Sequence, residues 1–125
     1  MNYRIYAVYF SDKRIKIGIS ADAERRMRYY VQESRRNRVQ DMTWWASKEF
    51  SKYSALLAER TVCRAYADKA ISGHRERFEG GLDLFEGISS SIENMRTALA
   101  QGGEIAEEIP YQGIQGSWRR DAHAH

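Results

Sequence analysis

The chain has 125 residues, enough for one domain with a single core and too few for two. Its hydrophobic fraction of 42% argues against intrinsic disorder, and its net charge of +3 is a mild basic bias compatible with nucleic acid. The single cysteine excludes an intrachain disulfide and a cysteine-based zinc site, and it suggests a reducing compartment. With no signal peptide and no run long enough to span a bilayer, we expect a cytoplasmic protein without a membrane partner.

The first third of the chain has the pattern of a β-hairpin followed by a helix. An aromatic and β-branched run over residues 3–10 is separated by a short polar break from a second run over 14–19, which alternates basic residues with isoleucines. After Ser20, apolar residues that include Ala23 and Met27 recur at helical spacing, with acidic residues in the first turn. These patterns predict two antiparallel strands and a first helix.

Three further elements are predicted downstream. The aromatic segment Met42–Phe50 reads as a strand, and Ser51–Ala70 and Leu82–Leu99 read as helices. Together with the hairpin they predict an α+β fold, in which a small antiparallel three-stranded sheet is flanked by about three helices. We expect residues 1–101 to form the domain and residues 102–125, which contain the only proline and end in His-Ala-His, to be a flexible C-terminal tail.

A basic patch lies in and after the first helix. Its candidate nucleic-acid-binding residues are Arg25, Arg28, Arg35, Arg36 and Arg38. Arginines beside exposed aromatic residues, here Tyr29 and Tyr30, suit a phosphate backbone. A solvated helix face explains the charge alone equally well.

Glu59 is the most informative single residue outside the hairpin. It falls within the apolar stripe of the second helix, three residues after Leu56 and four before Cys63. A carboxylate on a core-facing stripe is costly unless it is paired, hydrogen-bonded or bound to a metal. Two explanations stay open: a glutamate at the margin of the stripe, salt-bridged to an arginine, and a functional carboxylate.

Four short motifs, taken in order, resemble the GIY-YIG nuclease superfamily over about residues 3–80. The two signatures of that family correspond to residues 4–6 (Arg-Ile-Tyr) and 16–18 (Lys-Ile-Gly). Its arginine corresponds to Arg26 in Glu-Arg-Arg-Met, and its glutamate to Glu59 in Ala-Leu-Leu-Ala-Glu. The resemblance is closest to the small phage and bacterial branch with Lys-Ile-Gly, which suggests an origin in a phage or mobile element.

This resemblance implies a metal-dependent endonuclease that hydrolyses phosphodiester bonds in DNA, with RNA as an alternative substrate. In it, Glu59 holds Mg²⁺ or Mn²⁺, Arg26 clamps the scissile phosphate, and Tyr6 activates or positions the attacking water. A tyrosine with a pKa of about 10 needs a nearby cation to act as a base, and Lys16 is the expected one. If hairpin partners have residue numbers with an even sum, Tyr6, Lys16 and Gly18 share one face of the sheet. Gly18 is expected to let the substrate backbone or a helix approach closely.

A second function from another class is a catalytically degenerate module of the same type. It would bind nucleic acid or a protein partner without cleavage. Arg4 in place of the family's glycine and Lys16 in place of its second tyrosine favour that alternative. Because no separate zinc finger or helix-turn-helix is visible, we expect sequence preference to come from a homodimer or an accessory specificity protein.

Overall fold

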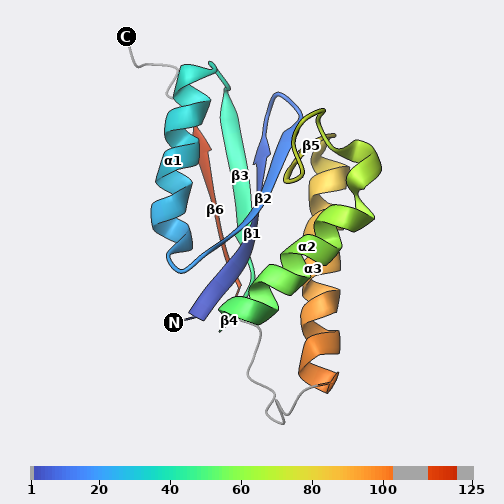
Figure 1. Cartoon of the computed structure of the whole chain (residues 1–125). Helices are drawn as coiled ribbons and strands as arrows, with labels where there is room; N and C mark the ends of the chain where they lie inside the picture. Colours follow the sequence, from blue (N-terminus) through green and yellow to red (C-terminus); the bar gives the residue numbers. More distant parts are fainter. Residues whose placement is uncertain (1, 103–112, 121–125) are drawn as a thin grey trace.

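The computed structural model describes residues 2–102 and 113–120 (Figure 1). Its elements, in chain order, are β1 (Asn2–Phe10), β2 (Arg14–Ser20), α1 (Ala23–Arg36), β3 (Asp41–Ala46), β4 (Phe50–Ser51), α2 (Lys52–Ala65), the short 3₁₀ helix η1 (Ala67–Lys69), β5 (Arg77–Glu79), α3 (Leu82–Gly102) and β6 (Ile114–Arg119). No helix in the described part of the chain is long and apolar enough to cross a membrane.

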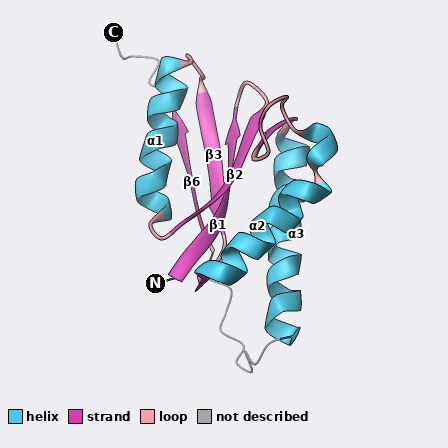
Figure 2. Ribbon diagram, viewed as in Figure 1, coloured by secondary structure: helices cyan, strands magenta, loops and turns pink. Residues whose placement is uncertain are grey.

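An antiparallel sheet forms the middle layer of the molecule. Its strand order is β5-β2-β1-β3-β6, and β4 pairs with the start of β1. Helix α1 covers one face of this sheet, while α2 and α3 lie together on the other (Figure 2). The predicted α+β class is confirmed, but the predicted three strands are too few, because the sheet has six in the part of the chain that the structure describes. The strands β4 and β5, with two and three residues, are too short to show an alternating pattern.

Strand β1 is buried on both faces, and its alternating side chains supply two separate cores. Ile5 and Ala7 point toward α2 and α3, whereas Tyr6, Val8 and Phe10 point toward α1. All five are at most 1% exposed, which explains why this stretch is continuously apolar and does not alternate with polar residues. The central strand therefore carries side chains to both sides of the sheet.

The helices begin at polar caps. The carboxylate of Asp22 accepts a hydrogen bond from the backbone N–H of Arg25 (3.1 Å), and the hydroxyl of Ser51 accepts one from the backbone N–H of Ser54 (3.3 Å). The second predicted helix is divided: α2 ends at Ala65, and the short helix η1 follows it.

Strand β6 lies within the segment that we expected to be a flexible tail (102–125). It pairs along β3, where Trp44 stands opposite Gly116. A Cβ built on Gly116 would lie 2.6 Å from Nε1 of Trp44, so the glycine makes room for the indole. A run of six residues with polar alternation and a central glycine is a weak strand signal, which explains the missed strand. The remaining tail residues, 103–112 and 121–125 with His123 and His125, lie outside the described residues.

Candidate nucleic-acid and metal site

The register of the hairpin places three of the predicted site residues, Tyr6, Lys16 and Gly18, on one face of the sheet. Tyr6 stands opposite Gly18, and Val8 stands opposite Lys16, so the predicted pairing is confirmed. A Cβ built on Gly18 would lie 2.5 Å from Cζ of Tyr6. The space above Gly18 is therefore filled by the ring of Tyr6, and the expectation that substrate or a helix approaches there was wrong.

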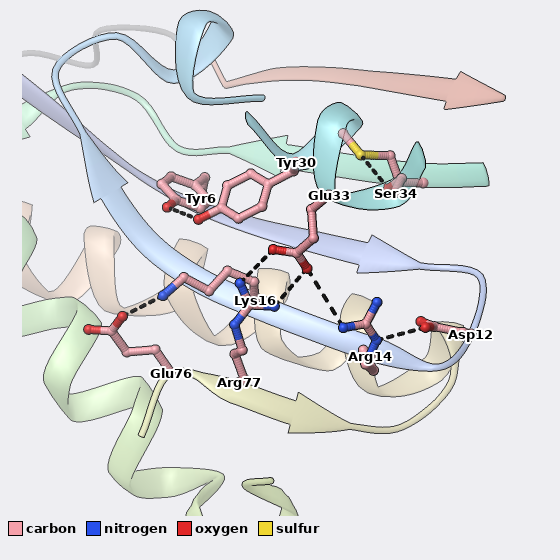
Figure 3. A network of polar contacts seen from close by, with 10 residues as sticks. Tyr6, Asp12, Arg14, Lys16, Tyr30, Glu33, Ser34, Glu76 and Arg77 are labelled. Atoms are coloured by element: carbon pink, nitrogen blue, oxygen red, sulfur yellow. Dashed lines mark hydrogen bonds and ion pairs between the residues drawn. The ribbon is translucent and has the colours of Figure 1, made fainter. Parts of the chain in front are cut away.

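Tyr6 belongs to a cluster with Tyr30 and Arg26 from α1. The hydroxyls of Tyr6 and Tyr30 are hydrogen-bonded to each other (Figure 3), with their oxygens 2.6 Å apart. The Tyr6 hydroxyl also interacts with the guanidinium of Arg26. Tyr30 is only 4% exposed, which corrects the expectation of an exposed aromatic residue, whereas Tyr29 is 59% exposed. Helical spacing of Tyr30 with Ala23 and Met27 was the signal for its burial.

The protonation of Tyr6 follows from this environment. Burial raises the pKa of Tyr6 well above its ordinary value, and the neighbouring Tyr30 raises it further. The charge and hydrogen bond of Arg26 act in the opposite direction without cancelling the effect of burial. Tyr6 is therefore a protonated phenol near neutral pH, and the cation beside it is Arg26 rather than the expected Lys16.

Lys16 is directed to a different group. Its ammonium nitrogen lies 2.5 Å from a carboxylate oxygen of Glu76, a contact visible in Figure 3. The backbone carbonyl of Glu76 also accepts a hydrogen bond from the N–H of Ile17 (2.9 Å), which holds the segment before β5 against the sheet. Glu76 thus helps to close this edge of the sheet. Its side chain pairs with Lys16 and also contacts Glu59.

Glu59 is buried on α2, with 6% of its surface exposed. Burial first, and then the charge of Glu76 and a hydrogen bond with that carboxyl, raise the pKa of Glu59 to about 7, against an opposing effect of Lys16. Its close neighbour is thus another carboxyl group. The predicted alternative of a marginal glutamate salt-bridged to an arginine was wrong, since no such salt bridge is found among the described residues.

A cavity of about 590 Å³ opens between the C-terminal half of α2 and the segment from η1 to β5. Its charged and polar lining residues are Glu59, Glu76, Arg60, Arg64, Arg75 and His74. Cys63 also lines it, and burial together with the charges of the two glutamates raises the pKa of its thiol to about 12. The thiol is therefore protonated and is neither a nucleophile nor a metal ligand in this state.

Two carboxyl groups in contact suit a divalent oxygen-ligated cation. Among residues 2–102 and 113–120, no cluster of three or more His, Cys, Asp or Glu side chains is close enough to hold a metal ion. Magnesium needs fewer protein ligands than three, because it is commonly bound by one or two carboxylates together with waters and substrate phosphates. Glu59 and Glu76 therefore fit the expected ion, since its charge would stabilise the ionised form of Glu59, which burial and then the charge of Glu76 disfavour.

Strand β2 links the two groups of residues. Tyr6 and Arg26 lie on the α1 side of it, and the side chain of Lys16 reaches from β2 to Glu76 and Glu59. Strand β5 pairs only with residues 14–16 of β2, so in the described part of the chain the rest of this edge has no partner strand. Two groups of residues therefore lie near this open edge of the sheet. In one, Arg26 contacts Tyr6; in the other, Lys16 contacts Glu76, which in turn contacts Glu59.

The arginine patch of α1 is exposed, as the sequence suggested. Its five arginines, Arg25, Arg28, Arg35, Arg36 and Arg38, all lie at the surface. The guanidinium of Arg26 lies 5.3 Å from the ring centre of exposed Tyr29, and that of Arg35 lies 5.9 Å from the ring centre of Trp118. Nucleic-acid binding by this patch stays a prediction.

A second ionic network on the same face is structural. Both terminal nitrogens of Arg77 donate to the carboxylate of Glu33 (2.9 and 2.8 Å), and Arg14 lies 3.7 Å from it (Figure 3). Burial of Glu33 opposes its ionisation, but the hydrogen bonds and charge of Arg77, with Arg14, hold its pKa below the ordinary value. The network joins α1 to β5, and its partners are too far apart in sequence for local patterns to show.

A comparison with protein families found that the model described as the T5orf172 domain matches residues 3–95, most of the chain. No curated protein and no solved structure matched the chain. The family match overturns the assignment to the GIY-YIG superfamily, because the family that matches is the T5orf172 domain. Roles implied by that resemblance for Tyr6, Lys16, Arg26 and Glu59 therefore depend on the contacts described above. The chain belongs to the T5orf172 domain family.

Proposed function

We propose that this protein is a metal-dependent endonuclease that hydrolyses phosphodiester bonds in DNA. The observation that carries the proposal is the contact between buried Glu59 and Glu76 at a cavity whose other charged residues are arginines. Lys16 offsets only one of the two negative charges that the ionised pair carries, which favours a further cation beside them, and arginines around them suit a phosphate. The family supports it, because a T5orf172 domain is nuclease-like and DNA-binding.

In this proposal Arg26 contacts the scissile phosphate. Its side chain lies at the protein surface, where the guanidinium interacts with the hydroxyl of Tyr6 and lies 5.3 Å from the ring centre of Tyr29. The planar fork of an arginine matches two phosphate oxygens. Tyr6 orients Arg26 and does not remove a proton from water, since burial keeps the phenol protonated.

Glu59 and Glu76 would hold the divalent ion, either magnesium or manganese. When bound, such an ion stabilises the charge that develops on phosphate oxygens and lowers the pKa of its water. Lys16 neutralises Glu76 and keeps its carboxylate beside Glu59, so the pair is oriented before DNA arrives. The arginine patch of α1, on the other side of β2, would position the DNA backbone.

The direct test is a plasmid-nicking assay with Mg²⁺ or Mn²⁺, comparing wild type with Glu59→Ala and Arg26→Ala. Both substitutions are expected to lower the cleavage rate by about 10²-fold or more, the scale at which single transition-state contacts act. EDTA should stop the wild type, and Glu59→Ala should still bind DNA. A folded wild type that binds DNA with either metal and never cuts it would instead support a binding module without cleavage.

A further inference from the structure

The arginines around the cavity have few partners within the protein. Arg60 and Arg64 lie one turn apart on α2, and Arg75 faces them from the segment before β5. All three are exposed. Within the described part of the chain, the side chains of Arg64 and Arg75 make no hydrogen bond or ion pair. Their charge is therefore available to an anion from outside.

Glu59 and the arginines occupy different depths of this cavity. Glu59 is 6% exposed and lies toward the sheet, whereas Arg60 and Arg64 lie on the next, outward face of the same helix. The arginines thus form the rim and Glu59 forms the floor. Three arginines outnumber the two carboxyl groups, and Lys16 neutralises one of these, so the cavity attracts anions.

The size and lining of the cavity indicate more than a phosphate ion. A volume of about 590 Å³ lies within the range of about 300–1,000 Å³ that small-molecule sites occupy. Apolar surface completes the lining, from Leu56, Ala67 and Ala70. A ligand with an anionic group at one end and a flat, partly apolar body fits both parts.

We propose that this cavity binds one nucleotide of the substrate strand, adjacent to the bond that is cut. Its phosphate lies between the rim arginines, and its sugar and base lie against the apolar lining. A strand held in this way brings its neighbouring phosphate toward Glu59 on the floor and the half-exposed carboxylate of Glu76 beside it. The inference rests on the proposed nuclease function, and it adds a substrate-binding subsite distinct from Arg26 and the arginine patch of α1.

The first experiment measures DNA binding in EDTA, where no metal-dependent cleavage takes place. Fluorescence anisotropy of a labelled oligonucleotide compares wild type with the double variant Arg64→Gln/Arg75→Gln across a range of salt concentrations. The double variant should neutralise one phosphate fewer, so its binding should be weaker. The salt slope, which is the slope of the logarithm of the binding constant against the logarithm of the salt concentration, should fall in magnitude by about 0.9 for duplex DNA or about 0.7 for a single strand. Lys13→Asn, a change of charge in the exposed β1–β2 turn, serves as the matched control and should leave the slope unchanged.

The second experiment locates the ligand by NMR chemical shifts with three probes: thymidine 5′-monophosphate, thymidine and inorganic phosphate. The mononucleotide should shift backbone amides of residues 59–64 and 74–76 more than either fragment does. Equal shifts from inorganic phosphate would contradict a nucleotide site. Tighter binding of the free mononucleotide than of an oligonucleotide would contradict a strand as the ligand.

Failure of the subsite and failure of the nuclease function give different results. An unchanged affinity and salt slope in the double variant, with wild-type thermal unfolding, overturns the subsite even if the protein cuts DNA. Cavity binding by a wild type that never cuts DNA overturns the nuclease function while the nucleotide site stands. The charge-preserving variant Arg64→Lys/Arg75→Lys should keep the salt slope and lose part of the affinity, because lysine lacks the bidentate fork.

Discussion

The ring of Tyr6 occupies the position that a side chain at Gly18 would take on the neighbouring strand. The two residues are direct partners in the hairpin, and a Cβ on Gly18 would lie 2.5 Å from Cζ of Tyr6. The glycine therefore leaves the room that the phenol occupies, next to Tyr30 and the guanidinium of Arg26.

Gly18→Ala should lower the free energy of unfolding by about 1–3 kcal/mol, because the added methyl group overpacks a buried ring. Urea denaturation followed by circular dichroism measures the change. Gly87→Ala is the matched control, because a Cβ there would lie 3.6 Å from the hydroxyl of Tyr66, an ordinary contact, within α3. That control should be neutral or stabilising by up to about 1 kcal/mol. Equal stability of Gly18→Ala and wild type would contradict the close packing of Tyr6.

Substitutions of the two partners of Tyr6 should move its pKa in opposite directions. Tyr30→Phe removes groups that raise the pKa of Tyr6, so the pKa should fall while burial keeps it above its ordinary value. Arg26→Ala removes the opposing cation, so the pKa should rise. Carbon-13 NMR of labelled tyrosine rings, at the highest pH at which both variants stay folded, should show a larger ionised fraction of Tyr6 in Tyr30→Phe than in Arg26→Ala. Loss of the Tyr6–Tyr30 hydrogen bond should also cost about 1 kcal/mol of stability. Shifts in the same direction would refute the described cluster.

The buried carboxyl of Glu59 should make stability fall with pH in a defined range. Its pKa in the folded protein is about 7, above the ordinary value of 4.5, so the folded state binds its proton more tightly. The stabilisation is fully present below pH 4.5 and is lost as the pH rises through about 7. Urea denaturation from pH 4.5 to 8 should show wild type losing stability relative to Glu59→Gln. Parallel profiles for the two proteins would mean that Glu59 is ordinarily solvated.

Divalent cations should raise the thermal unfolding midpoint, and more so at pH 8 than at pH 6. Protons compete with the metal for Glu59, whose pKa is about 7, so fewer sites can bind metal at the lower pH. The effect should grow with metal concentration by mass action. Glu59→Gln should remove it, whereas Glu86→Gln, an exposed glutamate on α3, should retain it. An identical response of both variants would exclude a metal site at Glu59.

Removal of the arginine patch of α1 should weaken DNA binding regardless of sequence. Replacing Arg25, Arg28 and Arg35 by glutamine should reduce the magnitude of the salt slope by about 0.9 for each phosphate that is no longer neutralised. Electrophoretic mobility shifts at several salt concentrations measure it, with Lys13→Asn as the single-charge control. If the triple variant binds as wild type does, the patch is only a solvated helix face.

Patterns over neighbouring residues predicted the hairpin register and the unusual position of Glu59. The hairpin register followed from the alternation of side chains, and Glu59 was singled out because a carboxylate interrupts an apolar helical stripe. The contact between Lys16 and Glu76 joins residues 60 positions apart, which no local period reveals. The cation beside Tyr6 was misassigned for the same reason, because which side chain reaches it depends on how α1 packs.

The assignment to the GIY-YIG superfamily was wrong because it rested on a few short motifs. The motifs that suggested it are short, and two of them lack a signature residue, since Arg4 and Lys16 stand where a glycine and a tyrosine were expected. The family model that matches, the T5orf172 domain, covers residues 3–95 and so depends on many more positions than these motifs do. The contacts of Tyr6, Arg26 and Glu59 do not depend on the family name, and the proposed chemistry is built on those contacts.

The role of Glu59 in metal-dependent cleavage is tested most directly by the rate of Mn²⁺-dependent plasmid nicking. This rate is compared between Glu59→Gln and Glu86→Gln, and DNA affinity is measured on the same samples. We expect Glu59→Gln to bind DNA as wild type does and to cut it about 10²-fold more slowly or not at all, while Glu86→Gln cuts normally. Wild-type nicking by Glu59→Gln, or loss of nicking in both variants alike, would contradict a metal-dependent reaction centred on Glu59.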